Sequence, residues 1–149
     1  MQQFTTQTPP QTDDPRCHVT RHEDAWQRVL PGLQALHAMY EDQDWSVDGV
    51  RRLLDEGEAL LIVDDEDATG FAVVLLRESR YYPGDMEIFV FLMWHQGGKA
   101  IRRFCQRFDQ IARATGARQI RFYSRRRGMT RLMTPEGFRP RAIEYVKEV

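Results

Sequence analysis

The sequence predicts a mixed α/β fold, in which a mostly antiparallel sheet with one parallel pair of strands is flanked by helices. Two amphipathic segments come first, three apolar runs rich in branched and aromatic residues follow, and a strand–helix–strand unit comes after them. With 149 residues, of which 42% are hydrophobic, the chain is long enough to bury one core and too short for two ordinary domains.

Two helices are expected before the first long strand. Apolar residues recur at helical spacing from Glu23 to Tyr40, and the pair Pro31-Gly32 should bend or break this helix. Ser46 is a typical N-cap for a second helix, and Gly57 is placed to end it.

The periodicity changes after residue 58. The runs ALLIVDD, GFAVVLLRES and MEIFVFLMW are separated by turn-forming clusters, so we expect three successive strands, mostly joined as hairpins. The acidic turn Asp64–Asp67 between the first two strands is expected to be exposed, and we assign it no function.

The rest of the chain predicts a crossover unit and a closing strand. A helix over Gly98–Thr115 connects the strand Met86–Trp94 to a strand over Gln119–Ser124, so these two strands should be parallel. A short helical turn at Met129–Met133 should follow. The alternation in residues 137–149, GFRPRAIEYVKEV, predicts a last strand.

The N-terminal stretch differs from the rest in composition. Residues 1–18 are polar and lack the apolar content to fold alone, so we expect a flexible arm followed by a single domain over residues 19–149. The sequence lacks a membrane span and a signal-peptide pattern, which predicts a cytoplasmic protein without membrane contact. Cys17 and Cys105 are expected to be free thiols, and the histidine spacing predicts no metal site.

The net charge of -1 conceals an asymmetry. Residues 95–149 hold 14 Lys and Arg against 4 Asp and Glu, a net +10, whereas residues 1–94 hold 7 against 18, a net -11. The C-terminal part is therefore a candidate anion-binding surface. The alternative is that the two parts neutralise each other within one domain and that the basic residues only solvate a helix.

A glycine pair stands at the start of the third expected helix. The stretch WHQGGKAIRRF, residues 94–104, places Gly97 and Gly98 between an apolar strand and an amphipathic helix. A helix N-terminus offers free backbone N–H groups and a partial positive charge, and glycines let an anion approach closely. A phosphate site is one interpretation of this stretch, and a simple tight turn is the other.

This order of elements resembles the GNAT superfamily of N-acetyltransferases. The family signature, Arg/Gln-x-x-Gly-x-Gly/Ala between a strand and a helix, corresponds to His-Gln-Gly-Gly-Lys-Ala at 95–100, and the closing Gly-Phe corresponds to Gly137-Phe138. The Gly-Phe-Ala at 70–72 resembles the start of the second strand in the family's early hairpin. The resemblance covers about Glu23 to Val149, and it implies a GNAT-like sheet whose central parallel strands splay apart.

The resemblance implies an acyl-coenzyme A site, with acetyl-coenzyme A as the co-substrate. The backbone at the end of the Met86–Trp94 strand would pair with the pantetheine arm, and the glycine stretch with its basic neighbours would wrap the pyrophosphate. The cofactor-binding residues expected on this basis are Phe91, Leu92, Met93, His95, Gln96, Gly97, Gly98, Lys99, Ala100 and Arg103.

The resemblance also implies catalytic roles. Glu87, which begins the strand MEIFVF, is the candidate base, and the alternative is an ordinary outward-facing strand residue. The tyrosine acid of the family is replaced here by Met133, so Tyr123 on the preceding strand is the candidate substitute. His95 also departs from the Arg or Gln of the signature, which removes a charge or an amide from the pyrophosphate loop.

The resemblance further implies an acceptor pocket, which the first helices and the loop between the early strands shape in the family. Several aromatic residues of this chain either line such a pocket or pack in the core. They are Trp26, Trp45, Tyr81 and Tyr82.

Two functions follow as hypotheses. The first is acetyl transfer to a primary amine of a small molecule or a protein. The second is a non-catalytic binding or structural protein, with a phage-encoded virion component left open, which contacts an acidic protein or nucleic acid through its arm and its arginines. A homo-oligomer is also left open. The arginines expected to make such contacts are Arg125, Arg126, Arg127 and Arg131.

Overall fold

One five-stranded sheet forms the centre of the molecule. The computed structural model describes residues 14–79, 82–96 and 99–149. The strands follow one another across the sheet in the order β1-β2-β3-β4-β5, and each neighbouring pair is antiparallel except β4 and β5, which are parallel. The predicted fold class is therefore confirmed. The strands are β1 (Cys17–Thr20), β2 (Ala59–Asp64), β3 (Phe71–Glu78), β4 (Met86–Trp94) and β5 (Gln119–Arg121).

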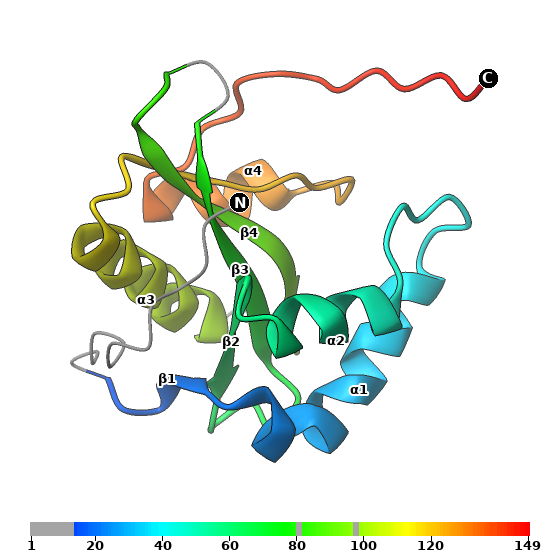
Figure 1. The fold of residues 1–149 in the computed structure, drawn as a ribbon, viewed down its shortest axis with the longest axis vertical. Coiled ribbons are helices and arrows are strands. Elements are labelled where there is room, and N and C mark those ends of the chain that lie inside the picture. The colour runs from blue at the N-terminus through cyan, green and yellow to red at the C-terminus, as the bar shows by residue number, and fades with distance from the viewer. Residues whose placement is uncertain (1–13, 80–81, 97–98) are drawn as a thin grey trace.

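Helices cover both faces of the sheet. Figure 1 shows α1 and α2 on one side and α3 on the other, so the molecule has three layers. The elements are α1 (His22–Ala38), α2 (Val47–Asp55), α3 (Lys99–Thr115), α4 (Met129–Met133) and the short 3-10 helix η1 (Thr134–Glu136). Among the described residues, these helices are all too short or too polar to cross a membrane.

The core lies on both faces of the central strands. Leu61 and Val73 pack with α1 and α2, whereas Ile62 and Val74, their neighbours along the strands, pack with α3. Successive residues of a strand point to opposite faces, so strands that are covered on both sides become continuous apolar runs. This burial explains why ALLIVDD and GFAVVLLRES lack a polar face.

The predicted helix boundaries are largely confirmed. The Ser46 hydroxyl accepts a hydrogen bond of 3.0 Å from the Gly49 N–H and caps α2. Gly57, with φ of 71°, follows the end of α2. The predicted break at Pro31 does not occur, because α1 continues through it and buries Val29 and Leu33 against the sheet.

One strand was not predicted. β1 contains Cys17 and His18, which belong to the segment expected as an arm, and it pairs with β2 in the register Cys17 to Asp64. The four residues of β1, CHVT, are too few to show an alternation of apolar and polar residues. The strand is recognised only because it pairs with the edge of β2. The expected arm up to residue 13 lies outside the described residues.

The predicted C-terminal strand is wrong. Residues 137–149 form no strand, and Figure 1 shows the chain running away from the body towards the C-terminus. Ile143 and Tyr145 are 77% and 89% exposed. A strand needs a neighbour for its backbone N–H and C=O groups, and within the described residues the tail pairs with none. The predicted strand at 119–124 is also shorter, since β5 ends at Arg121.

Candidate functional site

The parallel strands β4 and β5 part after three residues. Their pairing covers Glu87 to Phe89 on β4, whereas β4 continues to Trp94. On the other side of β4 the register shifts, because Val74 pairs with Val90 and Val73 with Leu92, which leaves Phe91 as a β-bulge. From Val90 onward, no described strand pairs with β4 on the β5 side, so this stretch presents a free backbone edge.

Aromatic side chains line the region where the strands part. The Phe89 ring lies 5.4 Å from that of Tyr123 and 6.2 Å from that of Phe91. Trp45, from the connection between α1 and α2, lies 6.2 Å from Phe91. Trp45 is thus placed beside the candidate site, whereas Trp26, at 6% exposure, is a core residue.

Glu87 is buried between two guanidinium groups. Glu87 is only 5% exposed, so the alternative interpretation, in which it is an outward-facing strand residue, is wrong. Arg77 Nε donates a hydrogen bond of 3.0 Å to Oε1, and Arg121 Nε lies 2.7 Å from Oε2. Arg77 also stacks on the Phe89 ring at 4.0 Å. Two cations therefore flank the Glu87 carboxylate, and its role as a base stays a prediction.

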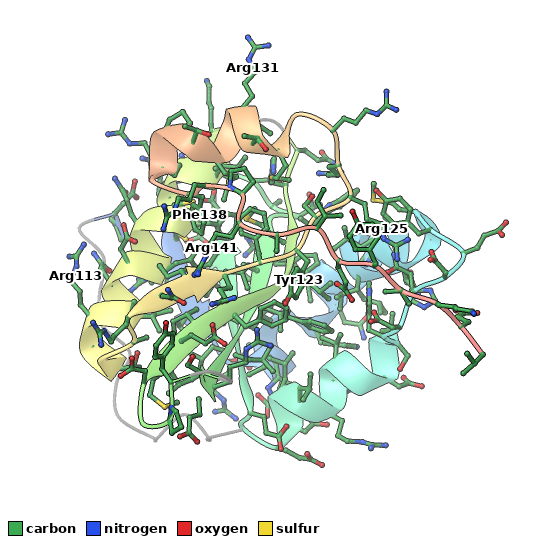
Figure 2. All side chains as sticks on the ribbon, turned by 90° about the horizontal axis from the view of Figure 1, so that it is seen from above. Arg113, Tyr123, Arg125, Arg131, Phe138 and Arg141 are labelled. Atoms are coloured by element: carbon green, nitrogen blue, oxygen red, sulfur yellow. The ribbon has the colours of Figure 1, made fainter. Side chains whose placement is uncertain are left out.

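Tyr123 stands just beyond the end of β5. Its side chain is 66% exposed, and Figure 2 shows it on the segment that leaves the sheet towards Arg125. Met133, which takes the place of the family's tyrosine, is 2% exposed and packs in the core with α3. Tyr123 is thus an accessible hydroxyl near the parting strands, and its acid role stays a prediction.

A hollow of about 340 Å³ lies between the β2–β3 turn and the start of α3. Lys99, the first residue of α3, is exposed and lines it together with Gln96, Ala100 and Arg103, four of the predicted cofactor residues. Phe91, Leu92 and Met93 lie on the half-buried end of β4. Gly97 and Gly98 lie outside the described residues. The other residues that line the hollow are Glu66, Asp67, Ala68 and Thr69.

Carboxylates of the β2–β3 turn bind the basic groups of this region. Asp64 accepts hydrogen bonds from Arg103, of 2.5 Å from Nε and 2.9 Å from Nη2. Arg103 also lies 3.4 Å from Glu66, and the Gln96 backbone N–H donates a 2.7 Å hydrogen bond to Asp67. The expectation that the whole turn is exposed is wrong for Asp64, which is fully buried.

Two opposing effects determine the pKa of Asp64. Burial alone would raise the pKa of Asp64, but hydrogen bonds from Arg103 and from the backbone N–H groups of Asp67 and Glu66 outweigh it. The pKa of this carboxyl is therefore below its ordinary value. Asp64 stays ionised and holds Arg103 in place, so Arg103 has a structural partner before any ligand arrives.

The groups at the end of β4 and at the start of α3 suit two parts of an acyl-coenzyme A. The free edge of β4 offers backbone donors and acceptors to an amide-containing arm, as sheet edges do to extended ligands. Lys99 and the N-terminus of α3 supply positive charge for a phosphate. Arg103, which is bound to Asp64, contributes least to such a site.

The arginines expected to contact a partner lie on the surface, and their contact role stays a prediction. Arg126, Arg127 and Arg131 are exposed, and Figure 2 shows Arg131 pointing away from the body. Arg125 differs from them, because it forms an ion pair of 2.5 Å with Asp42 and stacks 4.8 Å above the Tyr40 ring. Arg125 thus connects the segment after β5 to the α1–α2 connection, next to the aromatic side chains.

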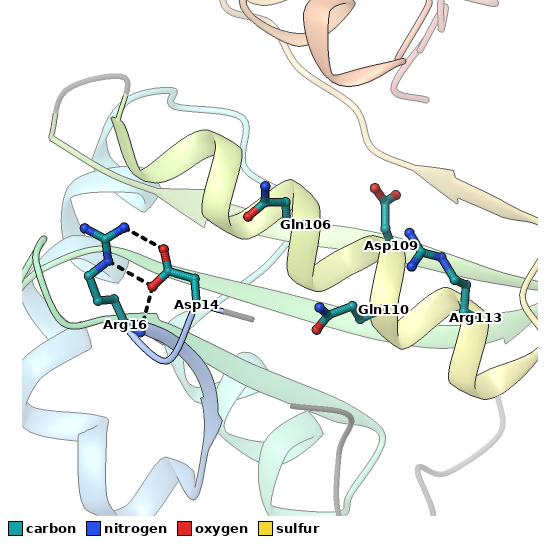
Figure 3. A pocket seen from close by; sticks show the side chains of 6 residues that line it. All are labelled: Asp14, Arg16, Gln106, Asp109, Gln110 and Arg113. Carbon is teal, nitrogen blue, oxygen red and sulfur yellow. Dashed lines mark hydrogen bonds and ion pairs between the residues drawn. The ribbon is translucent and has the colours of Figure 1, made fainter. Parts of the chain in front are cut away.

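A second hollow, of about 510 Å³, lies along the other side of α3 (Figure 3). Its lining is polar, and Arg16 and Asp14 in its wall form an ion pair of 2.6 Å. Among the described residues, it shares none with the hollow at the start of α3. The residues that line it are Asp14, Arg16, Gln106, Asp109, Gln110 and Arg113.

The cysteines are buried and unlinked. Cys17 and Cys105 are free thiols, 0% and 3% exposed, as the sequence predicts. Burial raises the pKa of each thiol to about 12, which removes the thiolate that nucleophilic or metal chemistry requires. Across the described ranges, no three His, Cys, Asp or Glu side chains are grouped as a metal site would need.

Known proteins resemble this chain in structure and not in sequence. No family model matches the chain, and no curated protein matches it significantly. A "probable acetyltransferase" is similar with a TM-score of 0.69 at 14% identity, over 90% of this chain and 98% of that one. A Trypanosoma brucei acetyltransferase has a TM-score of 0.62 at 13% identity, over 89% and 98%.

An aminoglycoside acetyltransferase from an uncultured soil metagenomic sample, solved with trehalose, is also similar. Its TM-score is 0.61 at 12% identity, over 89% of this chain and 92% of that one. At such identities the likeness shows the fold alone. The chain therefore has an acetyltransferase-like fold.

Proposed function

We propose that the chain binds acetyl-coenzyme A along the free edge of β4 and transfers the acetyl group to a primary amine. The observation that carries this proposal is the parting of β4 and β5 after Phe89, which leaves Val90–Trp94 with an unpaired backbone edge that leads towards α3. The acetyltransferase names of the structural neighbours support it. The acceptor is an amine of a small molecule or a protein.

The residues take the following roles in this proposal. When bound, the coenzyme supplies the acetyl group as a thioester. Glu87 accepts the proton of the amine, directly or through a water, as the amine nitrogen bonds to the carbonyl carbon and the carbon–sulfur bond breaks. Arg77 and Arg121 hold the Glu87 carboxylate in place. The Tyr123 hydroxyl gives a proton to the departing thiolate.

The side chains around the phosphates have separate tasks. Lys99 faces the hollow from the first turn of α3 and neutralises phosphate charge. Arg103 keeps α3 fixed to the end of β2 through Asp64. Trp45, Phe91 and Tyr123 provide an apolar surface beside the acceptor.

A calorimetric titration with acetyl-coenzyme A tests the proposal. We expect wild-type binding that Lys99→Glu weakens by about tenfold or more, since a charge next to the phosphates changes sign. Arg113→Glu makes the same change at the exposed far end of α3 and should leave the affinity unchanged. The acetylation of a panel of amines, followed by release of the coenzyme thiol, then tests transfer. Wild-type protein that does not bind acetyl-coenzyme A would refute the proposal.

A second candidate function is a non-catalytic binding protein. The observation that favours it is the pairing of Glu87 with two arginines, together with the exposure of Arg126, Arg127 and Arg131. In this case an anionic macromolecule binds the arginine surface with an affinity that falls steeply with salt. Salt-dependent binding of a polyanion, lost in an Arg126→Gln, Arg127→Gln double variant, combined with no acetyl-coenzyme A binding, would favour this function.

A further inference from the structure

The turn between β2 and β3 places a carboxylate on the backbone that precedes α3. Asp67 Oδ2 accepts a 2.7 Å hydrogen bond from the Gln96 N–H, although the two residues are 29 positions apart. Asp67 Oδ1 accepts from the Thr69 N–H at 3.2 Å and from the Thr69 hydroxyl at 3.0 Å. Each oxygen of Asp67 thus has a different partner, one within the turn and one in the segment that leads to the helix.

We infer that Asp67 is an internal competitor for the phosphates of acyl-coenzyme A and lowers the affinity of the chain for this ligand. The inference rests on the proposed function. The Gln96 N–H is a donor on the wall of the hollow in which the phosphates would lie. A single N–H makes one good hydrogen bond, so a phosphate oxygen gains it only if the carboxylate gives it up.

Charge strengthens this competition. Asp67 and Lys99 line the same hollow, and the negative charge of Asp67 repels a phosphate that enters it. Glu66, the other acidic residue of the lining, is compensated by Arg16 at 2.6 Å and by Arg103 at 3.4 Å. Asp67 is therefore the carboxylate of the turn that acts most directly on an incoming anion.

Asp64 does not share this role, because its carboxylate points to the buried guanidinium of Arg103 and also closes the turn. It accepts 3.0 Å hydrogen bonds from the N–H groups of Glu66 and Asp67. Its removal would disturb the turn itself. Asp67→Asn is a milder change, because an asparagine keeps the Oδ1 acceptor for Thr69 and replaces Oδ2, the acceptor of the Gln96 N–H, by an amide nitrogen.

The experiment compares wild type, Asp67→Asn and Asp65→Asn by calorimetric titration with acetyl-coenzyme A and with acetyl-pantetheine, which lacks the phosphates. Asp65→Asn removes the same charge from the same turn, where Asp65 pairs with His18 and Arg28 on the exposed surface. We expect Asp67→Asn to bind acetyl-coenzyme A about tenfold more tightly than wild type, with a gain that shrinks as salt is added. Asp65→Asn should bind acetyl-coenzyme A with the affinity of wild type, and the three proteins should bind acetyl-pantetheine with equal affinity.

The outcomes separate this inference from the proposed function. Binding by Asp67→Asn that is tighter than that of wild type supports both. Wild-type binding that Asp67→Asn leaves equal or weaker overturns the inference and leaves the proposed function standing. If wild type does not bind acetyl-coenzyme A, the proposed function is refuted, and the inference, which rests on it, is overturned as well. Thermal unfolding of each variant confirms that the fold is intact.

Discussion

Arg103 of α3 holds the buried carboxylate of Asp64, the last residue of β2, with hydrogen bonds of 2.5 Å from Nε and 2.9 Å from Nη2. This pair fastens the helix that begins at the candidate phosphate site to the central sheet. A buried ion pair of this kind adds little by itself compared with apolar packing, but the loss of one partner leaves an uncompensated charge. The pair therefore makes the position of α3 depend on one carboxylate.

Asp64→Asn should lower the free energy of unfolding by about 3 kcal/mol, because the buried Arg103 then loses its buried anion and keeps only the exposed carboxylate of Glu66 at 3.4 Å. Chemical denaturation at neutral pH measures the loss. Asp65→Asn, one residue along the turn and exposed, should change stability by less than about 1 kcal/mol. Equal losses in the two variants would show that the buried pair has no special role.

The ion pair between Asp64 and Arg103 should also make the free energy of unfolding depend on pH. The pKa of Asp64 is lower in the folded protein than its ordinary value, so the stabilisation is fully present above the unfolded-state pKa of about 4 and is lost as the pH falls through the folded-state pKa. Denaturation curves at several pH values between neutral and 3 should therefore show the gap between wild type and Asp64→Asn narrowing in acid. A gap that stays constant across this range would contradict the assignment.

Gly32→Ala should destabilise the protein, although alanine is the better helix former by about 1 kcal/mol. A Cβ at Gly32 would lie 2.7 Å from Phe71 Cε1 and 2.8 Å from Trp94 Cδ1, so α1 must move away from the sheet. We expect a loss of about 1–3 kcal/mol in the free energy of unfolding. Gln34→Ala, at an exposed position of the same helix, should cause no such loss. A more stable Gly32→Ala variant would show that the helix does not approach the sheet this closely.

Cys17 and Cys105 should react very slowly with a thiol reagent in the native protein at pH 8. Burial raises the pKa of both thiols to about 12, so almost no thiolate is present. Mass spectrometry after alkylation should show two modified cysteines in denaturant and almost none without it. Rapid labelling of either cysteine under native conditions would mean that β1 or α3 opens easily from the sheet.

Glu87→Gln should lower kcat for acetyl transfer by about 10²-fold or more, if Glu87 takes the amine proton. Glu78→Gln is a matched change in the same sheet, on exposed residue 78 of β3, and should leave kcat unchanged. Thermal unfolding of both variants separates a loss of activity from a loss of the fold. A folded Glu87→Gln variant with wild-type kcat would give Glu87 a structural role with Arg77 and Arg121.

Sequence patterns predicted the parts of the fold that local chemistry determines. The Ser46 cap, the end of α2 near Gly57 and the three apolar strands of the centre follow from capping, backbone freedom and burial. The structures of β1 and of the tail over residues 137–149 could not be predicted from local patterns, because each depends on whether a strand edge lies beside it. The four residues of β1 pair with an available edge of β2, whereas the alternating apolar residues of the tail meet no described strand.

The contacts of the candidate site could not be predicted from the sequence. Gln96, Lys99, Ala100 and Arg103 line one hollow, and their cofactor-binding role stays a prediction. The partners of Arg103 and Gln96 come from the acidic turn near residue 65, some 30 to 40 positions away. Nothing in the spacing of DDED reveals that one carboxylate faces inward, since the direction follows from where β2 ends.

Hydrogen exchange in the presence of acetyl-coenzyme A tests the central claim most directly. The account predicts that the ligand slows exchange of backbone amides in Val90–Trp94, the part of β4 without a partner on the β5 side, and in the first turn of α3. Amides of β2, which has strands on both sides, should be unchanged. Protection confined to the hollow beside Asp14 and Arg113, or no protection anywhere, would contradict a coenzyme site at β4.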